Sequence, residues 1–290
     1  MGLYPQPNQW QCGPFALKHA LVTLGIFADE KAITKAAGSH WWYGTDDIQL
    51  SKAAKQYQCT MKIIRRHDPE QARRELIGFL RRGIPTLLCI KEWGHWITVV
   101  KEESGRFIAL DSADKAVLTI LPWSKLKNIW VYHEQDELDK SFVRTIYDYH
   151  PILPKQRVRT KAKFSVARAK LLRRPENRPL SRHWDQYVAD LLDLCKPRTA
   201  LSERVISLGE FFRRHEEMIV DQVSYWHGTV TPQQARSLLK QFRLVADTYG
   251  LVIHIADEKR AIAGITALLT LWSAGKYGVQ PVYGESKKRR

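Results

Sequence analysis

The chain has 290 residues, of which 44% are hydrophobic and 26% charged, and its formal net charge is +16. This is the composition of a globular protein, and a chain of this length buries a proper core without a disulfide framework. Four cysteines with no CxxC pair and no HExxH-type metal spacing indicate free thiols in a reducing compartment, so we expect no metal and no other cofactor.

Two segments bear on localisation. Residues 1–12 lack the basic start and the continuous apolar stretch of a secretory signal. The most apolar late segment, residues 261–274, is too short to span a bilayer and is typical of a buried helix. We therefore expect a cytoplasmic protein without a transmembrane segment.

The N-terminal half begins with helices and continues with strands. Apolar periodicity and capping residues predict helices at 13–24, 30–37, 46–56 and 68–83. Strands are predicted at 60–65, 86–90, 95–100 and 107–111, followed by a helix or turn at 122–126 and a strand at 128–132. Helices followed by a mostly antiparallel sheet indicate an α+β fold rather than alternating βαβ units.

The pattern changes after about residue 140. Residues 147–154 and the stretch behind them have weak periodicity and are interpreted as linker, and helices are predicted at 184–194, 202–226, 232–249 and 258–274. The expected organisation is an α+β domain over 1–140, a basic linker over 141–182, and a small all-α domain over 183–290 that docks a substrate or partner.

Positive charge is concentrated in one stretch. Residues 1–140 hold 19 basic and 16 acidic residues, whereas residues 155–182, the basic segment, hold 11 basic residues and one acid, Glu176. Such a run is either a solvated linker or the footprint of an acidic partner, which would be a protein, a nucleic acid or a membrane surface.

Cys12 is the candidate nucleophile. A thiol attacks well only as a thiolate, which a helix N-terminus and a neighbouring imidazolium both favour. Cys12 stands at the start of the first predicted helix, where Gly13 keeps the approach open and Pro14 suits a first turn. The other cysteines (Cys59, Cys89 and Cys195) lie in strand-like or helix-end contexts that are typical of packing.

A histidine and an aspartate on neighbouring strands complete the chemistry. A turn centred on residues 103–104 sets His95 opposite Asp111, where a carboxylate can hold the imidazole in one orientation. Asp114 is the alternative, with a poorer register. His19 shares the helix face of Cys12 but lies about 10 Å along the axis, too far away to act as its base.

The glutamines before Cys12 are candidates for the oxyanion donor. Gln6 lies in the extended, proline-rich segment YPQPNQ, from which its side-chain amide could join the Cys12 backbone N–H at a developing oxyanion. Gln9 and Gln11 are competitors, and Gln11 is too close to the nucleophile to point into the same hole. Gln6 is therefore preferred.

These residues stand in a recognisable order. Gln6 and Cys12-Gly13-Pro14 are followed by GTDDIQL at 44–50, Gly83-Ile84-Pro85, Gly94-His95-Trp96 and Ala109-Leu110-Asp111. Over about residues 1–135 the arrangement resembles the C39-like branch of papain-fold cysteine peptidases. The resemblance implies that Gln6, Cys12, His95 and Asp111 are oxyanion donor, nucleophile, base and orienting residue.

Two classes of function follow. The first is a cysteine peptidase that cleaves a peptide or amide bond of a peptide or protein substrate through a thioester on Cys12. A variant of it transfers the acyl group to an acceptor other than water, through the same thioester. The second is a binding or adaptor protein that keeps a papain-like scaffold and uses the basic segment and helical domain for recognition.

Overall fold

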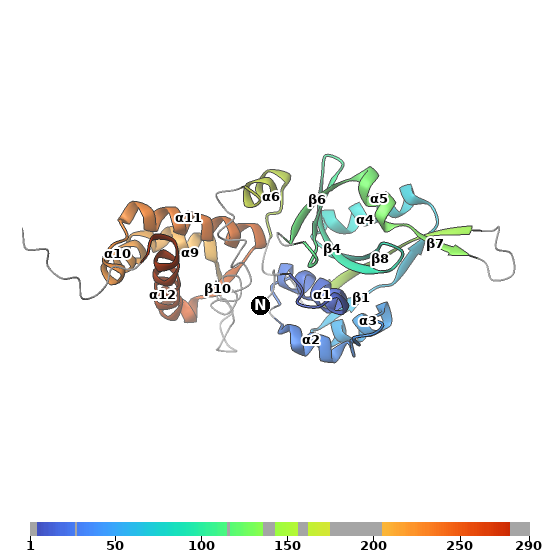
Figure 1. Cartoon of the computed structure of the whole chain (residues 1–290), viewed down its shortest axis with the longest axis horizontal. Coiled ribbons are helices and arrows are strands. Elements are labelled where there is room, and N and C mark those ends of the chain that lie inside the picture. The colour runs from blue at the N-terminus through green and yellow to red at the C-terminus, as the bar shows by residue number, and fades with distance from the viewer. Residues whose placement is uncertain are drawn as a thin grey trace, which may run out of the picture. The chain divides into compact units, whose positions relative to one another are not determined.

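The computed structural model describes residues 5–26, 28–114, 117–135, 143–155, 162–174 and 205–278. The chain divides into two compact units (Figure 1). The first comprises Met1–Leu192 with Thr248–Gly250, and the second comprises Asp193–Asp247 with Leu251–Arg290. The first unit combines helices with an antiparallel sheet, so the predicted α+β class is confirmed.

The first unit alternates between short helices and strands. Its helical elements are η1 (Gln9–Gln11), α1 (Cys12–Thr23), α2 (Glu30–Ala36), α3 (Asp47–Gln56), α4 (Pro69–Arg81), α5 (Trp123–Trp130) and α6 (Val166–Leu172). Its strands are β1 (Cys59–Met61), β2 (Ile64–Arg66), β3 (Thr86–Ile90), β4 (His95–Glu103), β5 (Arg106–Leu110), β6 (Leu118–Pro122), β7 (Tyr132–Gln135) and β8 (Val143–Pro154).

The strands form one sheet between two layers of helices. The strand order is β1-β8-β3-β4-β5-β6, β2 and β7 also pair with β8, and every pairing is antiparallel. Figure 1 shows α1, α2 and α3 on one side of the sheet and α4 and α5 on the other. Each layer buries its own apolar cluster against the sheet, so both faces of the central strands are covered.

The predicted helices of this unit form where their caps begin. Asp46 accepts from the backbone N–H of Gln49 while the Gln49 side chain accepts from the N–H of Asp46, which is a capping box at the start of α3. Asp68 accepts from the backbone N–H of Gln71, and Pro69 occupies the first position of α4. The Asp46 cap holds the end of the loop that contains Thr45 against the start of α3.

Four strand predictions need correction. The run at 60–65 is two strands, β1 and β2, and β6 was not predicted. The strand predicted at 128–132 begins only at Tyr132, the first residue of β7, because α5 continues to Trp130. The segment 147–154, predicted as linker, belongs to β8 in the middle of the sheet, so the predicted boundary at 140 is wrong for this strand. β8 is buried on both faces from Ile146 to Ile152 and therefore lacks the alternation of a half-exposed strand.

The second unit is mostly helical. It contains α9 (Leu208–Arg214), α10 (Glu216–His227), α11 (Pro232–Tyr249), η3 (Ile255–Asp257) and α12 (Glu258–Tyr277), with a two-stranded sheet of β9 (Val205–Ser207) and β10 (Val252–His254). The helices predicted at 232–249 and 258–274 are present. The one predicted at 202–226 is divided into β9, α9 and α10, and the one at 184–194 lies outside the described residues.

Part of the basic segment is built into the first unit. The N–H of Val166 at the start of α6 donates to Glu103, and Arg173 donates to the Leu118 carbonyl on β6 at 2.6 Å and pairs with Asp114 at 3.3 Å. Residues 156–161 and 175–182 of this segment lie outside the described residues. The acidic partner proposed for the segment stays a prediction. Within the described ranges, no helix has the length and apolarity to cross a membrane.

Candidate functional site

Cys12 is the first residue of α1, directly after the short helix η1. Its side chain belongs to the apolar cluster between α1 and the sheet, and the residue is 7% exposed. Gly13 lies against the loop and strand that flank the site, because a Cβ on it would be 3.0 Å from Thr45 Cβ and 3.4 Å from Trp96 Cδ1. Glycine at this position therefore lets the N-terminus of α1 approach the sheet.

The structure brings His95 and Asp111 together. Nε2 of His95, at the start of β4, lies 2.7 Å from Oδ1 of Asp111, the residue that follows β5. The same carboxylate oxygen accepts from the backbone N–H of Ala113 at 2.9 Å. With Nε2 occupied by Asp111, Nδ1 is the ring nitrogen left to exchange a proton with a nucleophile.

This contact arises from a register that differs from the predicted one. The turn between β4 and β5 is Ser104-Gly105, both with positive φ, as a two-residue type I′ hairpin turn requires. Glu103 therefore pairs with Arg106, and a bulge between Val99 and Lys101 shifts the later pairs by one residue. Continuing that register sets Asp111 opposite Ile97, so His95 and Asp111 meet diagonally on one face, within reach of their side chains.

The charges around the ring stabilise imidazolium. Burial by itself lowers the pKa of His95, but its interactions with the Asp111 carboxylate and with Cys12 outweigh burial and raise the pKa to about 9. Burial raises the pKa of Asp111, but the hydrogen bond and charge of His95 and the Ala113 N–H hold it below its usual range. Cys12, His95 and Asp111 thus lie close enough for their charges to interact.

The loop before His95 is strained and firmly anchored. Lys91, Glu92 and Trp93 all have φ between 52° and 60°, in the left-handed region that non-glycine residues rarely adopt. Glu92 accepts from the N–H and lies 2.7 Å from the ring Nδ1 of His133, while the Trp93 ring stacks at 3.6 Å on Tyr132. These contacts with β7 stabilise a backbone conformation that would be unfavourable for these three residues without them.

Gln6 is tied to the same loop as Asp111. Its backbone N–H donates to the Ser112 carbonyl at 2.9 Å, and the Ser112 hydroxyl donates to its side-chain Oε1 at 2.5 Å. Its amide Nε2 donates to the carbonyls of Asn8 and Gln9, at 2.9 and 3.0 Å. Both amide hydrogens are therefore engaged inside the loop that leads to Cys12, and Ser112 is a neighbour that the sequence did not indicate.

The competing residues have other environments. His19 is fully buried, and burial together with the charge of Lys18 lowers its pKa to about 3, which keeps the ring neutral. Burial raises the pKa of Cys59 to about 11. Asp114, the alternative to Asp111, pairs with Arg173. Cys195 lies outside the described residues.

Metal ligands do not gather in the described ranges. No group of three or more His, Cys, Asp or Glu side chains there is arranged to hold a metal ion. The Cys12 thiol and the His95 ring that interacts with it are the groups at this site that can support nucleophilic chemistry.

Comparison with known proteins gives structural neighbours only. No protein-family model and no curated protein matches the chain. It is similar to a double-glycine-motif protease from an AMS/PCAT transporter, solved in complex with the leader peptide, at 15% identity and a TM-score of 0.38, over 51% of this chain and 90% of that one.

Two further neighbours are peptidase domains of streptococcal ComA. The domain from Streptococcus ComA, a bi-functional ABC transporter of a quorum-sensing pathway, matches at 16% identity and a TM-score of 0.40, over 53% of this chain and 98% of its own. The domain from Streptococcus mutans ComA matches at 16% identity and a TM-score of 0.34, over 51% and 98%. Each match covers about half of this chain and 90% or more of the neighbour.

Proposed function

We propose that the first unit is a cysteine peptidase in which Cys12 is the nucleophile, His95 the base and Asp111 the residue that orients the base. The observation that carries this proposal is the His95 ring, held by Asp111 through Nε2 and charged through its contacts with Asp111 and Cys12. An imidazolium beside a cysteine at a helix N-terminus is the environment that favours a reactive thiolate.

The reaction proceeds in two halves. The Cys12 thiolate attacks the carbonyl carbon of the scissile bond, and an S–C bond forms as the carbonyl oxygen becomes an oxyanion. The His95 imidazolium protonates the leaving nitrogen, the C–N bond breaks, and an acyl thioester remains on Cys12. Neutral His95 then takes a proton from water as the water oxygen attacks the thioester carbon, the S–C bond breaks, and the acid leaves with the Cys12 thiolate and His95 imidazolium regenerated.

Gln6 is proposed to complete the oxyanion site with the backbone N–H of Cys12. For this, one of its amide hydrogens must leave the carbonyl of Asn8 or Gln9 when the oxyanion develops. Gln6→Ala should then lower kcat by about 10²–10³, the usual effect of losing one oxyanion donor. Steady-state kinetics on a cleaved peptide measure it, with Gln9→Ala as the matched control. Loss of turnover in Gln9→Ala alone would move the role to Gln9.

Selective alkylation of Cys12 tests the proposal without a known substrate. Near neutral pH, a small electrophile such as iodoacetamide should label Cys12 ahead of Cys59, Cys89 and Cys195, because burial raises the pKa of the Cys59 and Cys89 thiols. Peptide mapping of the intact protein after a short exposure reads out the order.

Two outcomes contradict the assignment. Equal labelling of all four cysteines, or labelling of Cys12 only after unfolding, removes Cys12 as nucleophile. A thioester that forms but is released only with an added amine acceptor would instead identify an acyl transferase, since both reactions share the same acyl-enzyme.

A further inference from the structure

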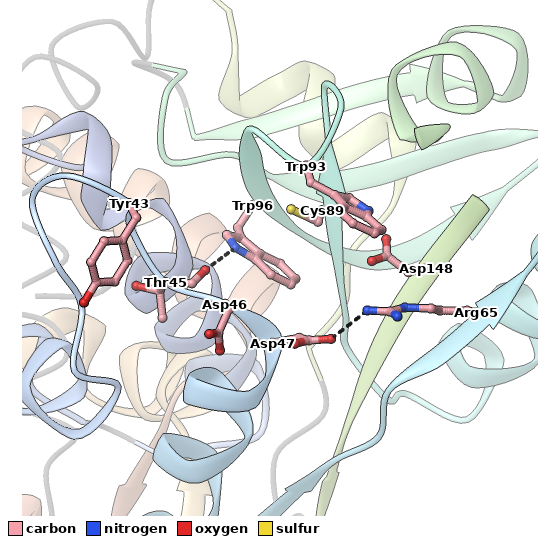
Figure 2. A pocket seen from close by; sticks show the side chains of 9 residues that line it. All are labelled: Tyr43, Thr45, Asp46, Asp47, Arg65, Cys89, Trp93, Trp96 and Asp148. Carbon is pink, nitrogen blue, oxygen red and sulfur yellow. Dashed lines mark hydrogen bonds and ion pairs between the residues drawn. The ribbon is translucent and has the colours of Figure 1, made fainter. Parts of the chain in front are cut away.

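A pocket of about 280 Å³ lies next to the proposed site, within the first unit. Figure 2 shows the nine side chains that line it: Tyr43, Thr45, Asp46, Asp47, Arg65, Cys89, Trp93, Trp96 and Asp148. Its volume falls just below the usual range of small-molecule sites, about 300–1,000 Å³. That size suits one side chain of a longer ligand better than a whole small molecule.

The floor of the pocket is a row of residues that crosses four strands. Arg65 on β2 pairs with Asp148 on β8, and Cys89 on β3 pairs with Trp96 on β4. The pairing of Leu87 with His150 sets Cys89 opposite Asp148 when it is continued by two residues. The floor is therefore rigid, because it belongs to the sheet and not to a loop.

The charge of the pocket is opposite to that of the chain. Three carboxylates face a single cation, Arg65, although the protein as a whole carries a net charge of +16. Arg65 already pairs with Asp47 at 3.4 Å, and Asp46 accepts the capping bond of α3. Asp148 takes part in neither of these two interactions.

Asp148 is buried without a full set of partners. The residue is 4% exposed, and its Oδ1 has no hydrogen-bond partner. Its Oδ2 lies 3.6 Å from Nε2 of the buried His150, beyond hydrogen-bond distance. A buried carboxylate oxygen without a donor is costly, so the pocket favours a ligand that brings a positively charged donor to it.

Aromatic rings line the same pocket as Asp148. Trp93, Trp96 and Tyr43 line the walls, and Trp96 is fixed by a hydrogen bond from its Nε1 to the Thr45 carbonyl at 3.0 Å. Arg65 already lies over the Trp93 ring, 5.4 Å from its centroid. Ring faces and a carboxylate together favour a guanidinium or ammonium group. The donor set does not suit a metal, because the described residues hold no metal-binding group.

The pocket shares its walls with the proposed site. Trp96 directly follows His95, and both Trp96 and Thr45 pack against Gly13, which follows Cys12. The pKa of Cys89 in the floor is raised, first by burial and then by the charges of Asp148 and Cys12, so these two groups lie within electrostatic range of it. A side chain in the pocket would belong to a residue close to the bond at Cys12.

We propose that this pocket binds the basic side chain, lysine or arginine, of the peptide whose bond is presented to Cys12. The substrate assignment rests on the proposed function, whereas cation binding by the pocket does not. The pocket is the specificity determinant of the site, and Asp148 is the residue that selects the positive charge.

Two small amides, and two substitutions with opposite expected effects on binding, test this pocket. N-acetyl-arginine N-methylamide should bind the full-length protein at least about tenfold more tightly than the citrulline analogue, which has the same shape without the charge, as followed by NMR titration. Asp148→Asn should remove this preference. Arg65→Gln should tighten arginine-amide binding several-fold, because it leaves Asp47 and the Trp93 face to the ligand. Lys62→Gln, an exposed change outside the pocket, should have no effect.

The outcomes separate this proposal from the peptidase. A variant that merely damages the fold cannot gain affinity, so tighter binding by Arg65→Gln supports the pocket even if Asp148→Asn folds poorly. Equal binding of the two amides, or no change in Arg65→Gln, overturns the pocket. Alkylation of Cys12 measured in the same samples reports on the proposed function. If Cys12 is labelled normally but the arginine amide binds no better than the citrulline amide, only the proposed cation binding is rejected. If the arginine amide binds better but Cys12 is not labelled, only the proposed peptidase is rejected.

Discussion

Cys12→Ser should lower peptide turnover by about 10⁴-fold or more, because removing the nucleophile of a catalytic triad leaves only binding and oxyanion stabilisation. A serine hydroxyl is a far weaker nucleophile than a thiolate stabilised by imidazolium, although the side chain is nearly isosteric. The measurement is kcat on a fluorogenic peptide mixture that the wild-type protein cleaves.

A matched control separates chemistry from packing. Cys59→Ala changes a fully buried thiol on β1, in the same apolar cluster as Cys12, and should keep turnover within a few-fold. Equal losses in the two variants would show that the cluster, and not the Cys12 sulfur, supports activity. Full activity in Cys12→Ser would reject the proposed mechanism outright.

His95→Gln should lower turnover by a similar factor of about 10⁴, because no other base faces Cys12 in the proposed mechanism. His67→Gln is the control, since His67 is exposed and hydrogen-bonds the Thr145 carbonyl away from the site. Its turnover should match that of the wild type. Activity that persists in His95→Gln would assign the base to another residue.

The effect of His95→Gln on the free energy of unfolding should also depend on pH. The folded-state pKa of His95 is raised from 6.5 to about 9, so its interactions stabilise the fold fully below about pH 6.5 and are lost as the pH rises through about 9. The pKa of Asp111 is lowered from 3.8, so its contribution is lost only as the pH falls below that value. Between about pH 4 and pH 9, both the His95 ring and the Asp111 carboxylate are charged in the folded protein.

Urea unfolding at pH 6 and pH 10 measures this signature. The difference in unfolding free energy between wild type and His95→Gln should be larger at pH 6 and should shrink at pH 10. A difference that stays constant across this range would show that the imidazolium does not interact with Asp111 and Cys12 in solution.

Local signals in the sequence predicted much of the N-terminal half. The caps at Asp46 and Asp68 indicate where α3 and α4 begin, and the apolar periodicity after Cys12 indicates α1, although every residue of α1 is buried in the fold. The pairing of His95 with Asp111 was predicted from a turn one residue out of place, and the contact forms because a bulge and a diagonal pairing still bring the two side chains together.

The predictions fail where residues from distant parts of the chain meet. β8 has no alternation because both of its faces are buried, and it places Asp148 and His150 at buried positions that a packed core would give to apolar residues. The bonds from Gln6 to Ser112 join residues 106 positions apart, which no local pattern encodes. Buried polar residues in a central strand mark the pocket, and function often lies where sequence and core packing disagree.

The place of β8 in the sheet also determines when the first unit can fold. β8 connects β1 and β2 to β3, so the sheet stays in two pieces until residues 143–154 have been synthesised. The sheet against which α1 packs is complete only some 140 residues after Cys12 in the chain. Such non-local pairing slows folding, because the entropy of closing long loops is lost before the contacts form. Until then the Cys12 thiol lies in an incompletely folded chain, without the folded environment of α1 and His95 that the proposed mechanism requires.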